Sequence, residues 1–267
     1  MSLGLDLSSS RAKLARALDL LKVLEADAVD AVRSGKGYAF VGELDEASGW
    51  YTVKVLTEPA PTLSVIFGEF IHDIRSALDY IVSGLVVASG QPILRWHQFP
   101  IYSGPAKFAS SVGTADRPRG PLLGIKSGFA EIEWHQPYND EVGGSARNAL
   151  TLLQRLSNTD KHRAIVRFSP FPSSSDVQIR HNGVIREQWE PTLPILWQPH
   201  VEAVLRKVCF AEPYPTQIEP RANMDVRLTF TDEAFPPEYP KPIFFDMKAL
   251  GTLLQQATAI IDTMSAL

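Results

Sequence analysis

The sequence predicts an α+β fold whose core is a bundle of four or more helices, and three observations predict it. Apolar residues recur with the 3.6-residue period of a helix in the first half of the chain and again near its end. The period changes to two near residue 164, which is typical of strands. Prolines are crowded between Pro191 and Pro242, and they favour loops and short strands over helices.

Four long helices are predicted near residues 10–34, 62–89, 145–157 and 246–265, with a shorter helical segment near 128–135. Ser8, Ser9 and Ser10 offer hydroxyl caps to the first helix. The second helix carries a broad apolar stripe, so it is expected at the centre of the bundle. We expect the four long helices to pack together.

A β-hairpin is predicted near the N-terminus, because Tyr38–Leu44 and Trp50–Thr57 are rich in aromatic and β-branched residues and a Gly-ended turn joins them. A β-rich segment is predicted at about 164–231. Within it, Asn182-Gly183 between two alternating runs predicts a second hairpin. Residues 90–128 are expected to be an irregular stretch on the surface.

The whole chain, 1–267, is expected to form one globular module with a helical part (about 8–163 plus 246–265) and a β-rich part (about 164–231). No segment is apolar and long enough for a membrane span, and the start of the chain lacks the pattern of a secretion signal. A single cysteine fits a reducing compartment, so a cytoplasmic location is expected. The net charge of −4 argues against a general polyanion binder.

Three further groups are expected at the core or its edge. Cys209 stands between Val208 and Phe210 and is interpreted as a core thiol. Trp96-His97 and Trp134-His135 each place an indole beside an imidazole, and both pairs are interpreted as core edges with a polar tip.

The second helix also carries a polar strip, made of His72, Arg75 and Asp79, which fall within about 60° of one another on the helix. One interpretation is a solvated face with an Arg75–Asp79 ion pair. The other is a functional strip, partly covered by another segment, because buried polar groups need partners.

A second cluster is predicted in a turn between the helical and the β-rich parts. It consists of Asn158, Asp160, Lys161, His162 and Arg163. Either these residues bind a ligand, or Asn158 and Asp160 cap the helix and hold the turn. We expect the turn to contact the polar strip, with Asp79 or His72 joined to Lys161, His162 or Arg163. No metal-ligand motif is present, so no metal or other cofactor is expected.

Four motifs together resemble a family of bacterial proteins without an assigned activity. They are His72-Asp73-Ile74-Arg75-Ser76-Ala77-Leu78-Asp79-Tyr80, Phe99-Pro100-Ile101, Gln136-Pro137-Tyr138 and Leu156-Ser157-Asn158-Thr159-Asp160-Lys161-His162-Arg163. The resemblance covers most of the first 165 residues and departs from the family's first motif at Asp73 and Tyr80. It implies that the polar strip and the turn at 158–163 belong together.

A more distant likeness is to HEPN domains, helical bundles of which many are metal-independent ribonucleases with an Arg and a His a few residues apart. Arg155 and His162 match that spacing, although Leu156 stands where a polar residue usually follows the Arg. The likeness implies His162 as general acid or base, with Arg75, Arg155 or Arg163 stabilising the charge on the reacting phosphorus.

Three functions therefore remain open. The first is a binding or interaction module that captures a nucleotide, an RNA or a protein partner. Its binding residues are His72, Arg75, Asp79, Tyr138, Asn158, Asp160, Lys161 and Arg163. The second is a metal-independent ribonuclease with His162, Arg163 and Arg75 as catalytic residues. The third is a purely structural protein. A homodimer is left open, and no membrane partner is expected.

Overall fold

The computed structural model describes residues 4–34, 38–57, 61–111, 120–140, 148–162, 168–189, 203–230, 244–245 and 247–267. The chain divides into two compact units. The helical unit comprises Met1–Leu24, Val65–Val166 and Lys248–Leu267, and the strand unit comprises Glu25–Ser64 and Arg167–Met247. The predicted α+β class is confirmed, whereas the expectation that both parts act as one module stays a prediction.

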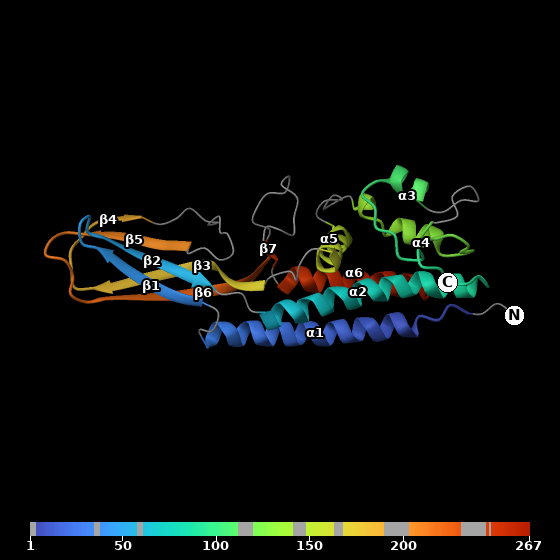
Figure 1. Cartoon of the computed structure of the whole chain (residues 1–267), viewed down its shortest axis with the longest axis horizontal. Helices are drawn as coiled ribbons and strands as arrows, with labels where there is room; N and C mark the ends of the chain where they lie inside the picture. The colour runs from blue at the N-terminus through green and yellow to red at the C-terminus, as the bar shows by residue number, and fades with distance from the viewer. Residues whose placement is uncertain are drawn as a thin grey trace. The chain divides into compact units, whose positions relative to one another are not determined.

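All four predicted long helices are present: α1 (Ser8–Arg33), α2 (Pro61–Ala88), α5 (Ala149–His162) and α6 (Met247–Met264). In the helical unit α1, α2 and α6 run alongside one another (Figure 1). Lys13 Nζ of α1 lies 2.5 Å from Asp73 Oδ1 of α2, and Arg11 of α1 pairs with Asp262 of α6. Among the described residues no helix is both long and apolar enough to cross a membrane.

The core of the helical unit is built around α2, as its apolar stripe predicts. Its fully buried side chains include Phe67, Phe70, Ile74, Leu78 and Ile81 of α2, Leu150 and Leu153 of α5, and Leu253 and Ile260 of α6. Burial of each such side chain stabilises the fold by roughly 1.5 to 3 kcal/mol. Hydrophobic burial on α2 is therefore what gathers the other helices.

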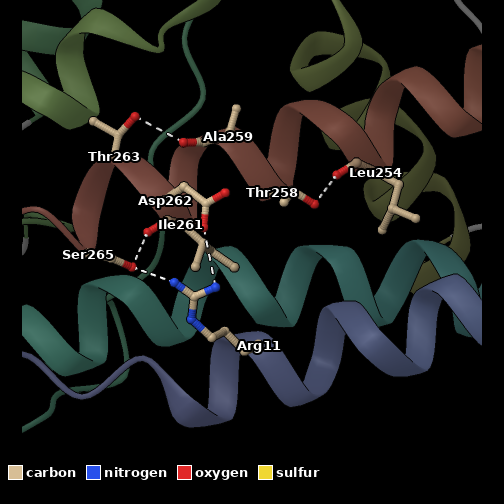
Figure 2. A network of polar contacts seen from close by, with 8 residues as sticks. All are labelled: Arg11, Leu254, Thr258, Ala259, Ile261, Asp262, Thr263 and Ser265. Carbon is tan, nitrogen blue, oxygen red and sulfur yellow. Dashed lines mark hydrogen bonds and ion pairs between the residues drawn. The ribbon is translucent and has the colours of Figure 1, made fainter.

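A polar network at the end of α6 joins this helix to α1 (Figure 2). Arg11 Nη2 donates a hydrogen bond to Ser265 Oγ over 2.7 Å, and Arg11 Nη1 lies 3.2 Å from Asp262 Oδ1. The Ser265 hydroxyl donates to the carbonyl of Ile261, four residues earlier. Because Arg11 and Asp262 are exposed, this ion pair contributes at most about 1 kcal/mol.

A short helix occupies part of the stretch at 90–128 that was expected to be irregular. This helix, α3 (Pro105–Ser111), was not predicted from the sequence. The helical segment predicted near 128–135 is confirmed as α4 (Phe129–Trp134), and the 3-10 helix η1 (Pro137–Asn139) follows it. Pro105 fits the first position of α3, where its missing N–H would have no partner in any case. Phe108 in this helix is fully buried, so packing sustains an element too short to be recognised by period.

The strand unit holds two antiparallel sheets. The four-stranded sheet has the order β1 (Tyr38–Asp45), β2 (Trp50–Thr57), β5 (Ala203–Phe210) and β4 (Ile185–Trp189). The three-stranded sheet has the order β3 (Phe168–His181), β6 (Ile218–Phe230) and β7 (Phe244–Phe245). The first predicted hairpin is confirmed, because β1 and β2 pair from Tyr38 opposite Thr57 to Asp45 opposite Trp50.

The second predicted hairpin is wrong, because β3 and β4 belong to different sheets. β3 pairs with β6, and β4 pairs with β5. Gly183 lacks the positive φ that a tight hairpin turn of this type requires. Instead, Asn182 Nδ2 donates to Thr216 Oγ1 over 2.9 Å, and Asn182 Oδ1 accepts the N–H of Gln217. Bonds to a distant loop therefore replace the local turn.

The two sheets share one apolar cluster. It contains Tyr51, Val53 and Val55 of β2, Val177 of β3, and Leu205, Val208 and Phe210 of β5. The predicted core position of Cys209 is confirmed by its 7% exposure. Gly42 of β1 leaves the space that the Tyr51 ring fills, since a Cβ at position 42 would lie 1.7 Å from Tyr51 Oη.

We expect Gly42→Ala to destabilise the strand unit by about 1 to 3 kcal/mol, because the buried Tyr51 ring has to move away from the new methyl group. Urea unfolding followed by circular dichroism measures the change.

The matched control is Gly251→Ala in α6, where the added Cβ meets no atom within 4 Å. This change is expected to stabilise the helical unit by about 0.5 to 1 kcal/mol through the higher helix propensity of Ala. Equal effects from the two variants would contradict the packing explanation.

Candidate functional site

Arg75 and Asp79 lie one turn apart on α2, and the predicted ion pair between them is present. Arg75 Nη2 is 3.0 Å from Asp79 Oδ1. The solvated-face interpretation is nevertheless wrong for Arg75, which is only 8% exposed. This arginine therefore lies in an environment where an unpaired charge would be strongly unfavourable.

The segment that covers Arg75 is Phe99-Pro100-Ile101, another of the sequence motifs. Arg75 Nη2 donates to the carbonyl oxygen of Phe99 over 2.7 Å, and Asp79 Oδ1 accepts the N–H of Phe99 over 2.8 Å. Both main-chain polar groups of Phe99 are thus bonded to side chains of α2. The ring of Phe99 is fully buried, so water could not readily replace these bonds.

Gln136 holds the same segment from a second side. Its Nε2 donates to the carbonyl of Pro100 over 2.8 Å and to the carbonyl of Ile132 over 3.1 Å. Its Oε1 accepts the N–H of Tyr102 over 2.9 Å. We call Arg75, Asp79, Phe99 and Gln136 the Phe99 clamp. Three of the four motifs therefore meet in one buried hydrogen-bond network.

The clamp limits what Arg75 can do chemically. A guanidinium that stabilises a reacting phosphate has to reach the substrate, whereas this one is bonded to Asp79 and to a main-chain carbonyl. Withdrawing Arg75 would leave a buried carbonyl without its partner, at a cost of about 1 to 3 kcal/mol. The arrangement is suited to fastening a loop to a helix.

Tyr138, a predicted binding residue, lies in an aromatic cluster beside the clamp. The rings of Tyr102, Phe129 and Tyr138 all pack against Phe108 of α3, with centroid distances of 5.5 to 6.4 Å. The Tyr138 hydroxyl donates to Glu133 Oε1 over 3.2 Å. Burial of the hydroxyl and the negative charge of Glu133 raise the pKa of Tyr138 to about 12, so it is a neutral donor at physiological pH.

Trp134 is the residue whose setting the sequence analysis missed. It was expected at a core edge, yet it is 73% exposed, more than any other large apolar side chain of the described residues. Its neighbour His135 is half-buried, as predicted. α4 is too short for the apolar period of its sequence to reveal this difference, because six residues make fewer than two turns.

The other predicted site residues are not brought into the clamp. His72 is exposed, and its Nε2 lies 3.3 Å from Ser76 Oγ on the next turn of α2. Asn158 is exposed on α5. The side chains of Asp160, Lys161 and His162, and all of Arg163, lie outside the described residues. The expected contact between them and the polar strip therefore stays a prediction.

The predicted turn at 158–163 is corrected in its first part, because α5 continues to His162. Asn, Thr and Asp weaken a helix by only a few tenths of a kcal/mol each relative to good helix formers. The buried face of α5, with Leu150, Leu153 and Leu156, holds the helix and outweighs that preference. Asn158 and Asp160 thus lie within a helix rather than after it.

Two imidazoles lie in or near the core of the helical unit. His135 Nε2 is 3.1 Å from Thr263 Oγ1, and the Thr263 hydroxyl donates its proton to the carbonyl of Ala259. His135 therefore donates through Nε2. His97 accepts the N–H of Leu94 at Nδ1. Burial lowers the pKa of both imidazoles below the ordinary 6.5.

Among the described residues no three His, Cys, Asp or Glu side chains gather to hold a metal ion.

Arg75→Ala is expected to lower the free energy of unfolding of the helical unit by about 1 to 3 kcal/mol, because it leaves the Phe99 carbonyl and Asp79 without their partner. Arg16→Ala is the matched control, since Arg16 pairs with Glu69 over 3.6 Å and both side chains are more than half exposed. Thermal and urea unfolding should show a change of less than about 0.5 kcal/mol for the control.

The unfolding free energy of the helical unit is expected to fall as the pH decreases below about 6.5. The folded pKa values of His97 and His135 are lowered, so the unfolded chain binds more protons there and acid favours unfolding. Stability from these two groups is fully present above the ordinary imidazole pKa and is lost as the pH falls.

Urea unfolding at pH 7.5, 6.5 and 5.5 measures this dependence, and a His97→Gln/His135→Gln double variant should show a smaller slope. His72→Gln changes an exposed imidazole and serves as the control. An unchanged slope in the double variant would contradict the assignment.

Comparisons with family models, with curated proteins and with solved structures find no match to this chain. The resemblance to the bacterial family with the Arg-Ser-Ala-Leu-Asp motif, and the more distant likeness to HEPN domains, therefore stay predictions from the sequence. The clamp itself is a finding of the structure, and in it three of those segments are joined by hydrogen bonds.

Proposed function

We propose that this protein is a non-catalytic interaction module whose partner is another protein. The observation that carries the proposal is the exposed indole of Trp134, which stands beside the Phe99 clamp on a fixed main chain. Aromatic residues, Trp above all, are enriched among the residues that dominate binding energy at protein interfaces. Of the three functions left open by the sequence, the binding or interaction module fits this surface.

The ribonuclease alternative loses one of its three catalytic residues. Arg75 is buried and bonded within the clamp, so it supports the fold instead of facing a substrate. The alternative then depends on His162 with Arg155 or Arg163. Tyr138 cannot supply a base near neutral pH, because its pKa is raised to about 12.

A protein partner is favoured over an RNA by charge. The chain has a net charge of −4, and α4 contains two glutamates and no lysine or arginine. A phosphate backbone approaching this helix would meet like charge. The same surface offers an indole and carboxylates, which suit the mixed apolar and charged side chains of a protein.

The first test is for RNA cleavage. The purified protein is incubated with labelled single-stranded RNA in a chelator, and no cleavage is expected. Metal-free cleavage that falls by roughly 10² to 10⁴ in His162→Ala, without a change in melting temperature, would instead establish the ribonuclease.

The second test is direct capture. A photo-cross-linking amino acid at position 134 is expected to form a discrete protein adduct in the cells that make the protein, identified by mass spectrometry. The same group at Leu18, an exposed apolar position of α1, is the control and should form no such adduct. Cross-linking to RNA, or equal adducts at both positions, would contradict the proposal.

A further inference from the structure

We infer that the surface around Trp134, defined by Glu131, Glu133 and Trp134 of α4, receives an arginine or lysine side chain of the partner protein. This inference rests on the proposed function and adds the chemistry of the group that is recognised. It is carried by three observations, which concern the rigidity of the surface, its exposed aromatic ring and its charge.

The main chain around Trp134 is fixed on both sides. Asn139 Nδ2 donates to the carbonyls of Glu133 and Trp134 over 2.8 and 3.3 Å. The next residue, His135, is bonded to Thr263 of α6. Gln136, one residue further, is buried in the Phe99 clamp. A surface that is already ordered loses little conformational entropy on binding.

The indole therefore stands exposed on a rigid support. Trp134 is 73% exposed, whereas Ile132 in the same helix is fully buried and anchors α4 to the core. Exposure of a large aromatic side chain on a fixed main chain leaves its face available to a ligand. Trp is the aromatic residue whose face attracts cations most strongly.

The charge of α4 itself is negative. Glu131 precedes Trp134 by three residues, and residues with this spacing are side-chain neighbours on a helix. Glu133 adds a second carboxylate, which accepts the Tyr138 hydroxyl at Oε1. α4 contains no lysine or arginine. A cation above the indole would meet at least one carboxylate, whereas an anion would be repelled.

An arginine fits this combination better than a lysine does. Its planar guanidinium stacks on an aromatic ring and can at the same time donate to a carboxylate. An apolar side chain would cover the indole but would leave the nearby carboxylate partly desolvated and unpaired. The partner segment is thus expected to be basic, with an arginine at its centre.

The binding test uses three fluorescein-labelled peptides that differ only at alternate positions: Gly-Arg-Gly-Arg-Gly, Gly-Lys-Gly-Lys-Gly and Gly-Glu-Gly-Glu-Gly. Fluorescence anisotropy at about 20 mM salt should rank them arginine, then lysine, with the glutamate peptide unbound. Trp134→Ala should weaken arginine-peptide binding by roughly 3- to 30-fold, the scale of a cation on an aromatic face. Because this variant keeps every charge, simple attraction to an acidic protein would not show the loss.

The contribution of charge is tested with a matched pair. Glu131→Gln should weaken binding of the arginine peptide, whereas Glu25→Gln removes the same charge from an exposed position of α1 and should not.

Trp134→Ala should leave the melting temperature unchanged, because the side chain is largely exposed.

The contact itself is tested by NMR with acetyl-arginine amide. The indole N–H signal that is missing in Trp134→Phe should shift on titration of the wild-type protein, more than the other indole signals do.

The inference is overturned if Trp134→Ala binds the arginine peptide as the wild type does, if no peptide binds at millimolar concentration, or if single-stranded RNA binds more tightly than the arginine peptide. Its failure is distinguishable from failure of the proposed function. A protein adduct at position 134 without peptide binding refutes only the cationic partner, whereas RNA cleavage or RNA cross-linking refutes the interaction module as well.

Discussion

The ion pair between Arg75 and Asp79 is hydrogen-bonded to both main-chain polar groups of Phe99. The packing of the segment Phe99-Pro100-Ile101 on α2 depends on this interaction. Phe99 is fully buried, so its main-chain N–H and carbonyl need polar partners there. Arg75 supplies the donor for the Phe99 carbonyl, and Asp79, one turn further along α2, supplies the acceptor for the Phe99 N–H. Gln136 completes the network from the other side, and its Nε2 also donates to the carbonyl of Ile132 in α4.

The positions of Tyr138 and Trp134 follow from this clamp. Because Gln136 is fixed, the 3-10 helix that begins at Pro137 directs Tyr138 toward Phe108 and Glu133. The same constraint leaves Trp134, two residues before Gln136, in solvent. Arg75, a predicted catalytic residue, thus stabilises the fold. The surface next to the clamp that it forms is the one for which we propose a function.

The described four-stranded sheet of the strand unit ends at β1 on one side and at β4 on the other, and the β4 edge is poorly suited to pairing with another strand. β4 is an edge strand of five residues, and its register against β5 shifts between Ile185 and Glu187. Short length, an irregular register and charged residues are common means by which proteins block addition of a further strand. This contrast is one reason why the proposed interface lies on α4 and not on β4.

The sequence by itself determined the four long helices and the first hairpin, and it offered the ion pair on α2 as part of one of two interpretations, because period, turn residues and helical spacing are local properties. A resemblance listed four motifs together and implied that the polar strip contacts the turn at 158–163, and that contact stays a prediction. Tertiary structure alone decided that Arg75 is buried, that Asn182-Gly183 joins two sheets, that α5 continues to His162, and that Trp134 faces solvent. Each of these depends on which distant segment covers a residue or bonds to it, and such long-range contacts leave no local pattern in the order of amino acids.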